Sequence, residues 1–269
     1  NGFVDNQGNK LHLYFGMQYD VQPGMQRDVV NGRPFKRLKP TPYLLNTVFA
    51  DRVNDTRYNK TFKDTWLSNK PGTYNTTFDG SKATVTYKAG DTTIFIPGYE
   101  MTLAERAAKK YQVLVPSLYN YALFPTLKKF FDPLRPDMTY ENGSRDYFVH
   151  RLADTYLMLA EAQFKLGKQA EAVAAINMVR VRAAAAGKTE QMKVTSVDMN
   201  LIMEERAREL AGEQTRWMDL KRWNNLVERV KLYNTDGAVG VRDIHYVRPI
   251  PQKQVDLSEN GGFPQNSGY

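Results

Sequence analysis

A chain of 269 residues with 42% hydrophobic content suits one large globular domain or two small ones and excludes a largely disordered protein. The absence of cysteine excludes disulfides, zinc–thiolate sites and thiol nucleophiles, and no apolar run is long enough to span a bilayer. The formal charge of +8 does not predict a nucleic-acid partner, because the basic residues are scattered and mostly interleaved with acidic ones.

Residues 1–140 are predicted to form a loop-rich part with short helices and a β-hairpin. The apolar run at 11–15 indicates a short strand, and the spacing of apolar residues in 41–51 predicts a helix. Segment 51–66 alternates charged and aromatic side chains. Such a pattern suits sugars, because flat rings cover the apolar face of a sugar while Asp, Asn and Arg bind its hydroxyls. Packing of the same rings in a small core explains the pattern equally well.

The middle of the chain changes to a β-like composition. Segments 84–87 and 93–96 are rich in β-branched and aromatic residues, lie on either side of a Gly-Asp pair and predict a β-hairpin. The polar segment 73–81 before them is expected to be an exposed loop, and 101–108 a short helix. The aromatic and basic segment 119–131 is expected to be irregular because prolines interrupt it.

Residues 141–269 are predicted to form a helical region with an extended tail. Segment 151–186 has the apolar and small residues of a tetratricopeptide-like helical hairpin. A single unit of this kind is not stable alone, so partner helices are expected to be degenerate in sequence or upstream of Asn1. Residues 244–250 indicate a strand, and 260–269 a coil laid over the surface.

The densest charge pattern lies in residues 201–223, which predict a helix, a break at Gly212 and a second short amphipathic piece. Thr195 and Asp198 precede it at the spacing of a capping box. Opposite charges recur three and four residues apart, which stabilises a helix surface. Pairing among these charges is favoured over catalysis, because ion-pair networks on helices are common without it.

Catalytic motifs are missing from the sequence. The three histidines, His12, His150 and His245, are isolated, and the chain has no H-E-x-x-H, G-x-S-x-G, phosphate-binding or dinucleotide-binding motif. The calcium-loop pattern is absent as well. We therefore expect a protein that is not an enzyme and that uses no cofactor and no metal ion. A glycosidase with two carboxylates stays open as the weakest alternative, since nothing singles out a pair.

The 201–223 segment resembles the C-terminal signature of the SusD/RagB family of outer-membrane lipoproteins of Bacteroidetes. The resemblance rests on Glu205, Arg206, Arg208, Glu209, Leu210, Ala211, Glu213, Arg216, Trp217, Asp219, Leu220, Arg222 and Trp223. It extends to residues 41–62, 151–162, 175–182, 249–251 and 265–269, with Ser267 departing from the proline that many members carry. These motifs are specific when taken together and in this order.

The resemblance implies a mainly α fold in which tetratricopeptide-like hairpins form a scaffold, and a loop-rich, minor-β part carries the ligand site. It also implies non-catalytic capture of oligo- or polysaccharides at the bacterial cell surface, and delivery to a SusC-like TonB-dependent transporter. The implied location is the outer membrane, through a lipid anchor on a cysteine that is absent here. The earlier helical repeats of the family are absent too, so we expect a C-terminal part of a longer protein. A peptide-binding or protein-interaction scaffold is the alternative function.

Binding aromatics vary among members of the family, so the candidate site is chosen by chemistry and position. We expect Tyr43, Trp66 and Tyr74 to act as stacking platforms for sugar rings. The hydroxyl partners are expected to be Arg57, Asp64 and Asn69.

Overall fold

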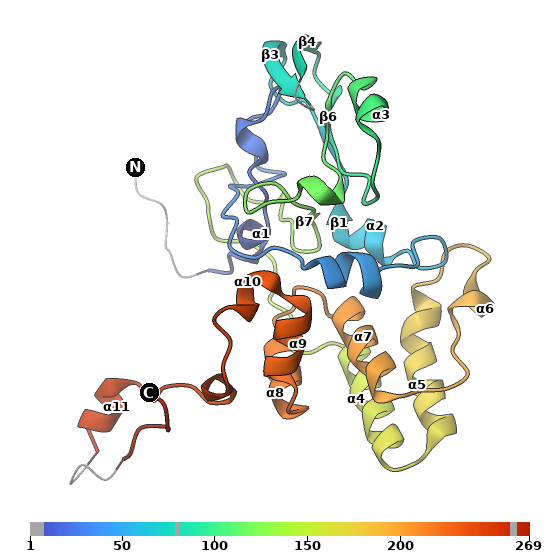
Figure 1. The fold of residues 1–269 in the computed structure, drawn as a ribbon, viewed down its shortest axis with the longest axis vertical. Coiled ribbons are helices and arrows are strands. Elements are labelled where there is room, and N and C mark those ends of the chain that lie inside the picture. The colour runs from blue at the N-terminus through green and yellow to red at the C-terminus, as the bar shows by residue number, and fades with distance from the viewer. Residues whose placement is uncertain (1–7, 79–80, 259–262) are drawn as a thin grey trace.

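Long helices gather in the second half of the chain and short strands in the first (Figure 1). This arrangement comes from a computed structural model that describes residues 8–78, 81–258 and 263–269. The fold is mainly helical with small sheets, as predicted. Among the described residues, no helix combines the length and apolar character that a bilayer crossing requires.

The predicted helical hairpin forms the centre of the helical half, with α4 over Leu152–Lys165 and α5 over Gln169–Arg182. The two helices pack closely because small Ala160 and Ala172 are both fully buried between them. A third helix, α7 over Met199–Glu209, lies against the pair and adds Ile202 to the same apolar core. The N-cap of this helix is Asp198, whose carboxylate accepts a hydrogen bond from the Leu201 amide at 2.7 Å, and not Thr195, the first residue of the predicted capping box.

The chain then turns at Gly212, as predicted. This glycine has a φ of +79°, and a Cβ there would collide with the side chains of Leu127 and Phe130. The later helices are short and follow each other along the molecule (Figure 1). They are α8 (Arg216–Arg222), α9 (Leu226–Tyr233), α10 (Thr235–Ala238), η4 (Asp243–Tyr246) and α11 (Gln252–Asp256). Another short helix, α6 (Thr189–Met192), lies between α5 and α7.

In the first half, the described residues form single helical turns and three small sheets. The turns are α1 (Leu11–Tyr14), η1 (Tyr19–Val21), η2 (Leu44–Val48), α2 (Arg57–Thr61), α3 (Leu103–Ala107) and η3 (Pro116–Leu118). The sheets pair β1 (Phe62–Lys63) with β7 (Thr126–Leu127), β5 (Thr92–Phe95) with both β2 (Thr65–Leu67) and β6 (Gln112–Val113), and β3 (Gly72–Phe78) with β4 (Ser81–Tyr87). Their cores meet the helical half through Ala211, which packs with Phe49, Phe62 and Leu127.

Three local predictions are wrong. Residues 11–15 form the helical turn α1 and 244–250 contain the 3₁₀ turn η4, because short apolar runs do not distinguish strand from helix. The hairpin has the wrong partners: β4 pairs with β3, the segment expected to be a loop, while β5 pairs with β2 and β6. Two parts of the predictions lie outside the described residues, namely 79–80 of the predicted loop and 260–262 of the predicted coil.

Candidate functional site

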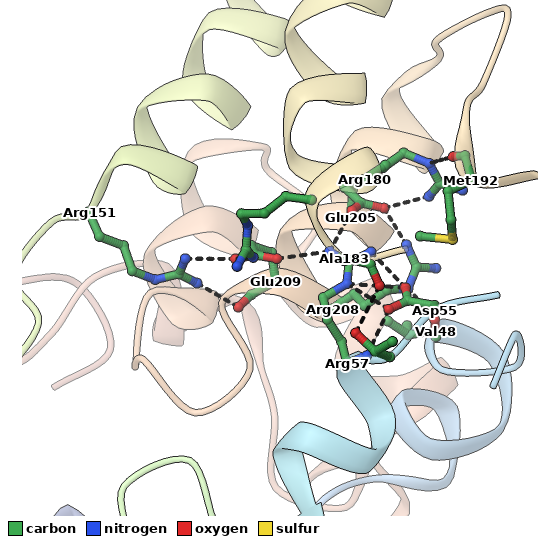
Figure 2. Close-up of polar contacts among 12 residues, drawn as sticks. Val48, Asp55, Arg57, Arg151, Arg180, Ala183, Met192, Glu205, Arg208 and Glu209 are labelled. Atoms are coloured by element: carbon green, nitrogen blue, oxygen red, sulfur yellow. Dashed lines mark hydrogen bonds and ion pairs between the residues drawn. The ribbon is translucent and has the colours of Figure 1, made fainter. Parts of the chain in front are cut away.

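The signature charges form a buried ion-pair network that joins the two halves of the chain (Figure 2). Arg57 of α2 binds Asp55 at 2.7 Å, Glu205 at 2.7 Å and Glu209 at 2.9 Å. Glu205 also accepts from Arg180 of α5 at 2.7 Å and from Arg208 one turn along α7. A single carboxylate with no exposed surface therefore holds arginines from three elements.

The network continues along both sides of α7. Glu209 binds Arg151 at 2.6 Å and Arg182 at 2.7 Å. Arg206 points the other way and binds Asp154 of α4 and Asp219 of α8, each at 2.8 Å. At its far end, Arg222 binds Glu161 at 2.6 Å, and the Trp223 indole donates to the same carboxylate at 2.8 Å.

Glu205 and Glu161 are held as anions. Burial desolvates Glu205 and opposes ionisation, but Arg57, Arg208 and Arg180 outweigh burial, so its pKa lies below the ordinary value. Burial acts on Glu161 in the same sense, yet the bonds from Arg222 and Trp223 lower its pKa from 4.5 to about 2. A general acid needs a raised pKa, so this network supports a structural role and not acid–base catalysis. Among the described residues, no cluster of His, Asp and Glu could hold a metal ion.

Two of the six expected site residues are not available to a ligand in this structure. Trp66 is fully buried and stacks on Tyr19 with ring centroids 4.6 Å apart, while the Lys63 ammonium covers it at 4.2 Å. Arg57 is buried in the ion-pair network. The structure therefore gives no support to a binding role for either residue, and that role stays a prediction. A tryptophan that alternates with charged residues has the same sequence pattern whether its ring faces solvent or the core.

Three of the other four expected residues contact neighbouring parts of the chain. Tyr43 stacks on Tyr233 at 3.9 Å. The Asn69 side chain bonds to the backbone of Gln26, and the Tyr74 hydroxyl donates to the Lys70 carbonyl at 2.6 Å. Asp64 is exposed beside β2. The role of these four residues in binding stays a prediction.

Two neighbouring clefts lie on either side of residues 36–42, a segment here called the strap. The tyrosine cleft has a volume of about 950 Å³ and is bounded by the strap, residues 116–124 and residues 234–237. The tryptophan cleft has a volume of about 780 Å³ and is bounded by the strap, Tyr14, Phe15, α7 and the start of α8. Arg37, Lys39 and the backbone around them line both clefts.

The tyrosine cleft combines an exposed ring with amide groups. Tyr121 is 79% exposed, and the Lys36 ammonium lies 5.7 Å from its ring centroid. Beside it, the Tyr119 hydroxyl is buried and has no hydrogen-bond partner within the described part of the chain. The side-chain amides of Asn46, Asn120 and Asn234 belong to residues that line the same cleft. An exposed flat ring beside side-chain amides is an arrangement that suits a sugar.

Tertiary structure places Tyr121 in solvent, whereas its sequence context does not single it out. The only sequence signal is the run YNYALF at 119–124, in which tyrosines alternate with an asparagine between two prolines. The Asn120 side chain folds back to accept from the amides of Ala122 and Leu123 at 2.8 and 3.0 Å. This turn leaves Tyr121 at its tip, where the ring has few neighbours.

The tryptophan cleft is more apolar and more basic. Trp217 is 38% exposed at its rim, and Tyr43, the one expected site residue in this wall, lies deeper. Arg216 donates to the Met203 carbonyl at 2.9 Å. Burial, followed by the nearby positive charge of Arg229, lowers the pKa of Arg216 below its ordinary value.

Comparisons with known proteins agree with the signature. A sequence profile of the SusD family matches residues 9–269. The SusD-like protein P25 of Formosa agariphila is 33% identical over 140 residues, which cover 50% of this chain and 27% of that protein. A laminarin-binding SusD-like protein of known structure superposes with a TM-score of 0.51 at 20% identity, over 97% of this chain and 44% of that chain.

A second solved structure, a SusD-like protein from Bacteroides fragilis, has a TM-score of 0.45 at 17% identity and covers 97% of this chain and 47% of that one. The chain thus spans less than half the length of each of these relatives. Proteins of this family are non-catalytic binding proteins. The sequence profile, the buried signature network and the shared fold together show that this chain belongs to the SusD family.

Proposed function

We propose that this protein captures a glycan at the bacterial cell surface without cleaving it. The tyrosine cleft is the site that best suits this role, and the exposed ring of Tyr121 is the observation that carries it. An exposed tyrosine presents a flat apolar face with a polar hydroxyl at its edge, which matches the apolar face and hydroxyl rim of a sugar. The laminarin-binding relative, which has the same fold and a glycan ligand in its name, supports this choice.

The proposal includes delivery of the glycan to a SusC-like TonB-dependent transporter in the outer membrane, where a lipid anchor would hold the protein on the surface. Family membership supports this placement. The test is co-purification of tagged full-length protein with outer-membrane proteins from its native cells, together with protease accessibility on intact cells. Recovery without any outer-membrane transporter, or protection of the protein from added protease, would contradict this part.

The glycan site is tested by affinity electrophoresis and calorimetry with laminarin, soluble starch, xylan, polygalacturonate and κ-carrageenan, and with a tryptic digest of casein. We expect at least one polysaccharide to bind. Tyr121→Ala should weaken that binding at least about tenfold, which corresponds to about 1.4 kcal/mol. Tyr99→Ala is the matched control, because Tyr99 is 58% exposed and lines neither cleft. Binding of peptides but not of polysaccharides would replace this proposal with peptide capture.

A further inference from the structure

The strap is unusually basic for a segment that bounds a ligand cleft. Its cations, Lys36, Arg37 and Lys39, lie within four residues of one another. The strap backbone is fixed by the Arg37 and Leu38 amides, which both donate to the Tyr14 carbonyl at 2.9 and 3.0 Å. These side chains therefore start from a defined position beside both clefts.

Most cations of the two clefts have no carboxylate partner. Within residues 8–78, 81–258 and 263–269, Lys36 donates only to the Gln18 amide oxygen at 2.9 Å, and the guanidinium groups of Arg37 and Arg248 make no hydrogen bond or ion pair. Among the described residues, the Arg216 guanidinium donates a hydrogen bond only to the Met203 carbonyl. Two cleft cations are paired. Arg206 binds Asp154 and Asp219, and Lys39 binds Asp236 at 2.9 Å, but that last carboxylate is 72% exposed.

The contrast with the buried network shows that arginine pairing is otherwise usual in this protein. Six cations and two carboxylates line the two clefts, and one of these carboxylates, Asp219, is already bound by Arg206 and Arg222. Concave walls of low polarity focus the field of such unbalanced charge and raise the local concentration of anions. A neutral polysaccharide would leave this positive charge uncompensated.

We propose that the glycan taken by these clefts is acidic, with carboxylate or sulfate groups on its sugars, and that Lys36, Arg37 and Arg216 bind those groups. The inference rests on the proposed glycan capture. The planar guanidinium groups match the geometry of carboxylate and sulfate oxygens, and the exposed ring of Tyr121 covers the apolar face of a sugar. A duplex phosphate backbone or a lipid headgroup would contact the cations but would not stack on the ring.

The test compares pairs of polymers that differ only in charge. Polygalacturonate is paired with the same polymer after reduction of its carboxyl groups, and κ-carrageenan with its desulfated form. We expect at least one acidic member to bind at least about tenfold more tightly than its neutral partner. Its binding should weaken at least about tenfold between 50 mM and 500 mM sodium chloride, because salt screens exposed charges.

Substitutions in the strap test whether its cations cause the tighter binding of the acidic polymer. Lys36→Gln and Arg37→Gln should each weaken binding of the acidic polymer about fivefold or more, while Lys36→Arg keeps it. Lys82→Gln removes the same charge from an exposed residue of β4, outside the strap, and should change binding less than twofold. Thermal unfolding by circular dichroism confirms that all variants are folded. Arg37 is exposed, so its replacement leaves the core intact.

Each alternative outcome has a definite meaning. Equal binding of acidic and neutral partners, unaffected by Lys36→Gln, overturns the inference but upholds glycan capture. Failure of every polysaccharide, with peptide binding, overturns both proposals. Binding of duplex DNA or phosphatidylglycerol vesicles as tightly as of the acidic polymer, with the same loss in Lys36→Gln, overturns the inference because recognition would then depend on charge alone.

Discussion

Replacing Glu205 by glutamine tests whether the buried network holds the two halves of the protein together. Glu205 has no exposed surface and accepts from Arg57, Arg180 and Arg208, which belong to α2, α5 and α7. Glutamine keeps the shape but removes the charge, so three guanidinium groups lose a common counter-ion. Removing one partner of a buried ion pair costs about 3–5 kcal/mol.

The lower end of that range is expected for Glu205→Gln, because the arginines keep other acceptors. Arg57 retains Asp55 and Glu209, Arg180 retains the Met192 carbonyl at 2.7 Å, and Arg208 retains the Val48 carbonyl at 2.6 Å. A loss of about 3 kcal/mol should lower the midpoint of urea unfolding by about 1 M, given a slope of about 3 kcal/mol per molar for a chain of this size.

The matched control is Glu190→Gln. Glu190 also pairs with a cation, Lys193 at 2.6 Å, but its side chain is 77% exposed, so the change in unfolding free energy should stay within about 0.5 kcal/mol. If Glu205→Gln lowers the unfolding free energy by no more than this control, the network does not hold the fold together. The interpretation of the family signature as scaffold would then have to be abandoned.

Two further predictions concern stability. The pKa of Glu161 is lowered from 4.5 to about 2 by folding, so the unfolded state takes up a proton at a higher pH than the folded state does. The ionised Glu161 carboxylate therefore stabilises the fold fully above pH 4.5, and this stabilisation is lost as the pH falls toward 2. Glu161→Gln should accordingly flatten the pH dependence of the unfolding free energy in that window, and an unchanged acid limb would refute the pairing with Arg222. Trp66→Ala should lower the unfolding free energy by about 3–5 kcal/mol, because it empties a fully buried site. The folded variant, measured at low temperature, should bind glycan as tightly as the wild type. A stable variant with weakened binding would instead support Trp66 as a stacking platform.

The helical half could be predicted because its signals are local. The hairpin of α4 and α5, the cap at Asp198 and the break at Gly212 all depend on residues within a few positions of one another. Helical periodicity and capping are short-range effects, so they are visible in the sequence. The pairing of opposite charges in the signature could be anticipated as well, but their partners could not.

The surroundings of the expected site residues depended on long-range packing. Arg57 meets Glu205 across 148 residues of chain, and strands β4 and β5 chose partners other than each other. Sheet partners depend on which edges meet in space, and the sequence of a strand does not specify its neighbour. The pattern of charges and rings around Trp66 is therefore compatible with either a core or a binding surface.

The sequence alone determined the family, the helical scaffold and the absence of thiol chemistry, because motif identity, helix periodicity and composition are properties of the chain itself. Only the tertiary structure decided which rings meet solvent. It buried Trp66 and left Tyr121 exposed, and it placed Lys36, Arg37 and Arg216 around two clefts in which cations outnumber carboxylates. Exposure and charge balance are sums over neighbours that the chain brings together from distant positions, so they follow from packing and not from local sequence.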